Sequence, residues 1–162
     1  MNIKNFKPII YFIPLAVIQL TVIPLIAVDN ITPNIIFILI AYYTLMFGQS
    51  YGTILGFALG FIFDIISGGL IGASMISFTL SAFIAGYFYS DNKIDFNTKS
   101  FFFLLIIFIC GSINSFIYAV ISNSNTSVNT FYIILFEGLL PGLYTSLFGL
   151  PFVIISPKKG LS

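Results

Sequence analysis

Residues 48–72 read GQSYGTILGFALGFIFDIISGGLIG, an apolar stretch punctuated by small residues. Glycine recurs at Gly52, Gly56 and Gly60, and the carboxylate of Asp64 takes the next place in this period of four. A period of four is close to one helical turn, so these residues share one ridge of a predicted helix. Small-residue ridges let membrane helices approach closely, because lipid supplies no hydrophobic drive that could replace such packing. The stretch predicts a membrane helix, about residues 50–66, that packs through its glycine face.

The composition agrees with a membrane protein. Of 162 residues, 59% are hydrophobic and only 7% are charged, against roughly a quarter charged in soluble domains. The chain has no His, Arg or Trp, so the commonest general base and the phosphate-binding guanidinium are missing. The single Cys110 lies in an apolar run and is expected to serve as a small packing residue. We therefore expect no enzyme, no cofactor, no metal and no nucleic-acid partner.

Apolar runs of membrane length follow one another along the chain, separated by short polar breaks. The predicted helices are about 8–28, 33–47, 50–66, 70–89, 100–121 and 131–155. The second and third are short, about 22–26 Å at 1.5 Å per residue, so they are expected to pair as a tight hairpin, to stand nearly upright or to sit in a thinned membrane. The sequence predicts an all-α integral membrane protein with one six-helix domain over residues 1–162.

Lysines set the expected orientation. They lie in three groups: Lys4 and Lys7, Lys93 and Lys99, and Lys158 and Lys159. With six spans and a cytoplasmic N-terminus, all three groups face the cytoplasm, as the positive-inside rule requires. The first apolar run is too long for a signal peptide and lacks a small-residue cleavage site, so it is expected to remain as the first helix.

The fourth helix carries its own small ridge, at Ala73, Ser77, Ser81 and Ala85. Two arrangements follow from it: the third and fourth helices pack on each other, or one ridge is kept for a partner. Prolines at positions 14, 24, 141 and 151 are expected to kink the first and last helices, with a bend near Pro141.

Asp64 and Glu137 are the two carboxylates expected inside helices. Asp64 lies close to the outer end of its helix. It is either wetted by headgroup water, hydrogen-bonded to the turn Ser67-Gly68-Gly69, or part of a binding site. Gly68 or Gly69 is expected to end this helix in a left-handed conformation.

Glu137 lies about 9 Å inside the last helix, and Pro141 frees its backbone carbonyl. It is either neutral or snorkelling, or it faces a wet cavity or a partner's cation. A catalytic pairing of Asp64 with Glu137 has no support in the spacing. Polar residues within helices one and five are expected mainly to link helices by hydrogen bonds: Gln19, Thr21, Asn114 and Ser115.

Two stretches resemble the MreD family of bacterial rod shape-determining membrane proteins. Pro33-Asn34 followed by apolar residues is similar to the opening of that family's second helix. The glycine-bearing helix that ends in Asp64-Ile65-Ile66-Ser67-Gly68, with Gly72 downstream, is similar to its most recognisable segment. Leu150-Pro151 also matches, whereas Lys158-Lys159 replaces the longer Arg-rich tail expected of the family.

The resemblance implies a non-enzymatic scaffold of the cell-elongation complex in the bacterial inner membrane. Its implied partners are MreC, the synthase RodA with its class B penicillin-binding protein, MreB indirectly, and membrane lipid. It also implies a fold like that of the S components of energy-coupling-factor vitamin transporters, so a solute-binding subunit is the alternative function. Short loops and sparse polar residues in the outer half favour the scaffold.

Overall fold

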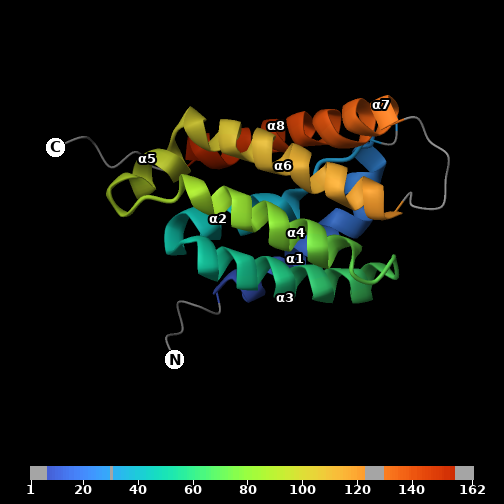
Figure 1. The fold of residues 1–162 in the computed structure, drawn as a ribbon, viewed down its shortest axis with the longest axis horizontal. Coiled ribbons are helices and arrows are strands. Elements are labelled where there is room, and N and C mark those ends of the chain that lie inside the picture. Colours follow the sequence, from blue (N-terminus) through green and yellow to red (C-terminus); the bar gives the residue numbers. More distant parts are fainter. Residues whose placement is uncertain (1–6, 30, 123–129, 156–162) are drawn as a thin grey trace.

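The computed structural model describes residues 7–29, 31–122 and 130–155, and this part of the chain is built from helices (Figure 1). The longer helices are α1 (Lys7–Thr21), α2 (Ile35–Phe47), α3 (Gln49–Ser67), α4 (Ala73–Ala85), α6 (Phe101–Ser122) and α8 (Leu140–Ile155). The short elements are η2 (Ile23–Ile26), η3 (Gly86–Phe88), η4 (Asp91–Lys93), α5 (Ile94–Lys99), α7 (Thr130–Tyr132) and the π-helical η5 (Ile133–Leu139).

The core forms around α2. Ile36, Phe37, Ile40 and Leu45 of this helix are fully buried, and α2 contacts α1, α3, α4, α6 and α8. The two most extensive packed pairs are α3 with α4 and α6 with α8, which lie side by side in Figure 1. A helix that is apolar all round and only 13 residues long is stabilised chiefly by this enclosure.

Three helices of the described residues are long and apolar enough to cross a membrane: Gln49–Ser67, Phe101–Ser122 and Ile133–Ile154. The pair Ala73–Phe88 and Asp91–Lys99 passes the same test only jointly, with a bend of 82° between its parts. Pro8–Thr21 and Ile35–Phe47 are apolar but shorter. Six crossings, both termini in the cytoplasm and the S-component fold therefore stay predictions.

The first helix is shorter than predicted. The α-helix ends at Thr21, and a 3₁₀ turn with Pro24 near its start replaces the expected continuation to residue 28. The reason is the proline ring, which removes an N–H donor and collides with the carbonyl four residues earlier. By contrast, α1 passes Pro14 without ending.

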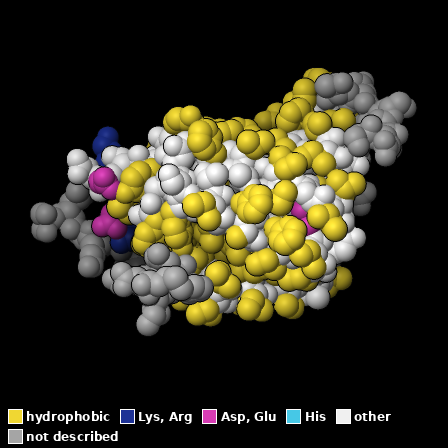
Figure 2. Space-filling view, turned by 60° about the horizontal axis from the view of Figure 1, so that its bottom comes forward, with side chains coloured by type: hydrophobic (Ala, Val, Ile, Leu, Met, Phe, Trp, Pro, Cys, Tyr) yellow, Lys and Arg dark blue, Asp and Glu magenta, His cyan; other side chains and the backbone are white. Residues whose placement is uncertain are grey.

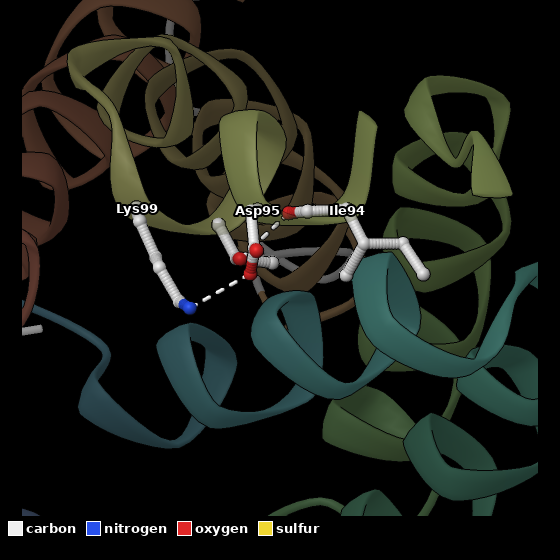
Figure 3. Close-up of polar contacts among 4 residues, drawn as sticks. Ile94, Asp95 and Lys99 are labelled. Atoms are coloured by element: carbon white, nitrogen blue, oxygen red, sulfur yellow. Dashed lines mark hydrogen bonds and ion pairs between the residues drawn. The ribbon is translucent and has the colours of Figure 1, made fainter. Parts of the chain in front are cut away.

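The polar break between the predicted helices 70–89 and 100–121 contains two short helices, η4 and α5. Lys99 and Asp95 form an (i, i+4) ion pair with an N–O distance of 2.7 Å (Figure 3), and the Thr98 hydroxyl donates to the Ile94 carbonyl at 2.7 Å. Interactions between a side chain and a group one turn away stabilise a short helix that has no long apolar run. Figure 2 shows charged side chains gathered at this end of an otherwise largely hydrophobic face.

The last membrane helix changes its winding before Pro141. Residues Ile133–Leu139 form a π-helix, and the Leu140 N–H donates to the Leu135 carbonyl, five residues back. Proline cannot supply the donor that a regular helix needs, and a π-turn is one way to absorb that defect. The irregularity expected near Pro141 is thus a change of winding that precedes the proline.

Candidate functional site

Asp64 caps the next helix. Its side chain is 2% exposed, and its carboxylate accepts three backbone N–H bonds from the start of α4. Gly72 and Met75 donate to Oδ2 at 2.8 and 3.2 Å, and Ser74 donates to Oδ1 at 3.1 Å. These are donors that a helix N-terminus leaves without intrahelical partners, and a negative charge there is favoured by the helix dipole. The carboxylate of α3 thus stabilises the start of α4.

This geometry corrects the water-wetted interpretation of Asp64, because the carboxylate is buried. It also corrects the proposed bond to the Ser67-Gly68-Gly69 turn, since the donors lie beyond that turn. The turn contacts Asp64 only through the backbone: the Ser67 hydroxyl donates to the Asp64 carbonyl at 3.3 Å and accepts from the Gly69 N–H at 3.4 Å.

Two glycines give the turn between α3 and α4 its shape. Gly68 ends α3 in the left-handed region, with φ 64°, as predicted for Gly68 or Gly69. Gly72 precedes α4 with φ 101°, so residues 70–72, expected in the helix, belong to the turn. Both conformations are open to glycine at little cost and are rarely adopted by other residues.

The glycine ridge is used inside the molecule. A Cβ on Gly52 would lie 2.1 Å from Thr44 Oγ1 of α2, whereas one on Gly56 would lie 2.8 Å from the Phe78 carbonyl oxygen of α4. A Cβ on Gly60 would lie 2.6 Å from the Cα of Met75. Of the two arrangements that the sequence left open, the structure contains the packing of α3 on α4, and the ridge is not free for a partner.

The small residues of α4 lie on the buried side of that helix. Ser77 and Ser81 are fully buried. The Ser77 hydroxyl donates to the Ser74 carbonyl at 3.2 Å, whereas Ser81 Oγ has no hydrogen-bond partner among the described residues. Both serines therefore allow close helix packing, and Ser81 leaves one polar atom unsatisfied within the bundle.

A polar cavity of about 430 Å³ opens at the end of the bundle that holds the α3–α4 turn. Its polar lining residues are Gln19, Thr32, Asn34, Ser74, Asn114, Ser115, Tyr118, Ser122 and Glu137, and its other lining residues are Phe63, Ala119, Phe136 and Pro141. They come from α1, the segment before α2, α3, α4, α6, η5 and α8. The structure thus gathers polar groups that the sequence analysis judged too sparse to converge.

Several cavity residues are already committed to holding helices together. Gln19 of α1 donates to the Pro33 carbonyl at 3.0 Å and accepts from the Ile35 N–H at 2.9 Å. Asn34 caps α2 by accepting from the Phe37 N–H at 3.1 Å. Gln19 is thus an interhelical link of the kind predicted.

The other polar residues of the predicted set behave differently. The Thr21 hydroxyl donates to the Val17 carbonyl of its own helix at 2.7 Å, which corrects its expected interhelical role. Asn114 is 2% exposed and its Oδ1 has no partner among the described residues. The interhelical bond predicted for Asn114 is therefore not made through its amide oxygen.

Glu137 lies in η5, the π-helical turn before Pro141, and both residues line the polar cavity. Asp64 is not among the lining residues, although its neighbours Phe63 and Ser74 are. The structure gives no catalytic pairing of the two carboxylates: Asp64 is occupied with the backbone of α4, and Glu137 faces a different environment.

An apolar groove with a volume of about 1000 Å³ lies between α1 and α8, with α2 at its floor. It is lined by Tyr11, Pro14, Leu15 and Ile18 of α1, by Ile35, Ile38, Leu39, Tyr42, Tyr43, Met46 and Phe47 of α2, and by Phe148 and Phe152 of α8. Tyr42 contacts Phe152 edge-on, with ring centroids 4.8 Å apart. The groove is a lateral opening toward the surroundings of the bundle.

In a comparison with protein-family models, the model described as rod shape-determining protein MreD matches residues 2–155. The chain belongs to the MreD family. Searches of curated proteins and of solved structures gave no match.

In this chain, the segments that resemble MreD proteins cap helices and let them pack closely. Asn34 caps α2 and Asp64 caps α4, so each begins a helix that belongs to the buried part of the bundle. Gly56 and Gly60 then let α3 approach α4. The motif of this MreD-family chain therefore describes how the α3–α4 hairpin is built.

Sequence reasoning missed two long-range hydrogen bonds of the MreD-family bundle. The Asn34 N–H donates to Thr145 Oγ1 at 2.9 Å, and the Tyr144 hydroxyl donates to the Ile26 carbonyl at 2.9 Å. Both join α8 to the segment between α1 and α2, more than 100 residues away. The sequence does place two adjacent polar residues, Tyr144 and Thr145, in an apolar helix. This pattern does not identify their hydrogen-bond partners.

Proposed function

We propose that this MreD-family protein is a non-enzymatic scaffold of the cell-elongation complex in the bacterial inner membrane. It contacts MreC directly, supports the synthase formed by RodA and a class B penicillin-binding protein, and reaches MreB through the complex. Membership of a rod shape-determining family supports the role in cell shape. The observation that carries the proposal for direct contact is the apolar groove over α2.

Of the surfaces of the bundle, the groove is the one best suited to bind a transmembrane helix of a partner. Its floor is the partly buried face of α2, including Leu39, Tyr42 and Met46, and its volume of about 1000 Å³ lies at the upper limit of small-ligand sites. Packing between membrane helices depends on shape because lipid tails are as apolar as the helices themselves. A concave surface therefore supplies more contact to a partner helix than a convex one.

The glycine ridge of α3 is excluded as the binding surface for a partner helix, which supports the choice of the groove. Gly56 and Gly60 lie against the backbone of α4, so they are not available to a partner helix. The outward side of α3 carries Ile54, Phe57 and Ile65, which are 70%, 52% and 58% exposed. Their size keeps a partner's backbone distant, as expected of side chains that face lipid. We assign the groove to the transmembrane segment of MreC.

Site-specific photocrosslinking tests this assignment. A photoreactive amino acid at Leu39, in the floor of the groove, is expected to capture MreC in cells that contain the whole complex. The same amino acid at Ile54 is the matched control, because Ile54 is an apolar residue within α3 and is 70% exposed. Equal capture from both positions, or capture from Ile54 alone, would refute the groove as the MreC site.

A second candidate, a solute-binding subunit like an S component, is favoured by one observation, the polar cavity of about 430 Å³. This volume lies within the range of small-molecule sites. The candidate predicts saturable binding of a vitamin-sized ligand by the purified protein, which the scaffold role does not require.

A further inference from the structure

The chain turns sharply after α4. The helices Ala73–Phe88 and Asp91–Lys99 meet at a bend of 82°. The first of them contains α4, which packs along α3, a helix long and apolar enough to cross a membrane. A bend close to a right angle therefore carries η4 and α5 across the end of the bundle, in the direction of the membrane plane. In Figure 1, α5 lies at the end of the bundle opposite to the α3–α4 turn.

Polar residues attach α5 to this end of the bundle. Asn97 and Thr98 are only 4% and 1% exposed. The Asn97 side-chain N–H donates to the Phe88 carbonyl at 2.6 Å, which holds α5 against the end of η3. The helix also contacts α2, α6 and α8. Its orientation is thus fixed, with Asn97 and Thr98 turned inward.

The outward side of α5 carries an aromatic ring. Phe96 is 57% exposed, although the two residues that follow it are buried and polar. In water, the hydrophobic effect favours the opposite arrangement, with phenylalanine inside and asparagine and threonine outside. The ring centroids of Phe96 and Phe102 are 5.7 Å apart, and Phe102 lies in the first turn of α6, another helix long and apolar enough to cross a membrane. Phe96 is therefore exposed where a membrane-crossing helix begins.

Charged residues share this surface with the aromatic ring. The Asp95 side chain is 71% exposed and pairs with Lys99 at 2.7 Å (Figure 3). Residues 91–99 contain two Asp and two Lys, so their formal net charge is zero. On either side of this stretch, Tyr87 and Phe101 are 71% and 70% exposed. Aromatic rings beside charged side chains are typical of the boundary between lipid headgroups and acyl chains, which accepts both.

We propose that residues 87–101 form an anchor in the lipid headgroup region, with α5 parallel to the membrane plane. The rings of Tyr87, Phe96 and Phe101 reach the boundary of the acyl chains, and the charged side chains stay level with the headgroups. Because the net charge of residues 91–99 is zero, the anchor binds zwitterionic lipid and needs no anionic lipid. The anchor is separate from the apolar groove, and its partner is the lipid of the bilayer.

Tryptophan fluorescence measures the depth of these rings. The chain has no tryptophan, so Phe96→Trp gives the full-length protein a single such fluorophore. In phosphatidylcholine bilayers, its emission is expected to be quenched more by lipids brominated near the headgroup than by lipids brominated near the end of the acyl chain. Phe57→Trp is the matched control, because Phe57 lies near the middle of α3 and is 52% exposed. Its quenching is expected to follow the opposite order.

Quenching of Phe57→Trp but not of Phe96→Trp would overturn the proposal, since it would place the ring of residue 96 in water or against protein. Stronger quenching of Phe96→Trp by the deep bromines would also overturn it, and so would quenching that requires added phosphatidylglycerol, an anionic lipid. Should Phe96→Trp fail to fold, Phe101→Trp carries the same test with the same expected order. The bilayers contain no MreC, so the outcome is independent of the crosslinking result for the groove.

Discussion

Replacing Asp64 with Asn tests whether the carboxylate stabilises the α3–α4 hairpin. The native side chain accepts three N–H bonds, two on Oδ2 and one on Oδ1. An asparagine has one acceptor oxygen, and its best orientation keeps the Gly72 and Met75 bonds. Its amide NH₂ then faces the Ser74 N–H, donor against donor.

The expected loss follows from these contacts. One hydrogen bond to a charged acceptor is removed, at about 1.5–3 kcal/mol. The negative charge at the start of α4 is also removed, at about 0.3–2 kcal/mol. Asp64→Asn is therefore expected to lower the free energy of unfolding by about 2–5 kcal/mol, a large share of the stability of a typical domain.

Reversible unfolding in mixed micelles of mild detergent and dodecyl sulfate, followed by circular dichroism, measures this difference. Asp95→Asn is the matched control, since Asp95 is a carboxylate on α5 whose side chain is 71% exposed. Its exposed ion pair with Lys99 is worth about 0–1 kcal/mol. Equal unfolding free energies for the wild type and Asp64→Asn would refute the capping role, whatever the effect on cell shape.

Two further substitutions test the packing and the link between helices. Gly60→Ala places a methyl group 2.6 Å from the Met75 Cα and is expected to lower the free energy of unfolding by about 1–3 kcal/mol. Gly69→Ala is the control, because the nearest atom to its added methyl group is 3.4 Å away. Equal losses in the two variants would contradict close packing as the cause. Gln19→Leu removes two interhelical hydrogen bonds and is expected to lower the free energy of unfolding by at least about 2 kcal/mol. Thr21→Val is the control and is expected to change it by no more than about 0.5 kcal/mol. The two variants are compared by their rates of proteolysis, and similar rates would contradict the interhelical role of Gln19.

The sequence was sufficient to predict features that depend on residues near one another in the chain. The helical class followed from long apolar runs, and the end of α3 followed from Gly68, whose left-handed φ of 64° suits glycine. Glycines at a period of four indicated close packing, and Gly60 lies against the backbone of α4. Each inference needed only the geometry of one helix or one turn.

Features that depend on tertiary partners were harder to predict. The N–H groups that bind Asp64 are 8 to 11 residues away, across a turn whose path depends on Gly72. The early end of α1 depended on how the backbone resolves the defect at Pro24, either by a bend or by a stop. The polar cavity draws on residues from 19 to 141, and no periodicity within one helix indicates that such residues meet.

Two buried polar side chains, Asp64 and Asn114, differ in whether their oxygen atoms have hydrogen-bond partners in the bundle. Asp64, which first suggested a binding role, has its oxygens occupied by the backbone of α4, so it is a poor candidate to bind anything else. Asn114, which was expected to link helices, is buried with an acceptor oxygen that the described bundle leaves unused. Because an unused buried acceptor costs free energy and a used one contributes it, the carboxylate of Asp64 stabilises the α3–α4 hairpin, whereas the unused oxygen of Asn114 lowers the stability of the bundle.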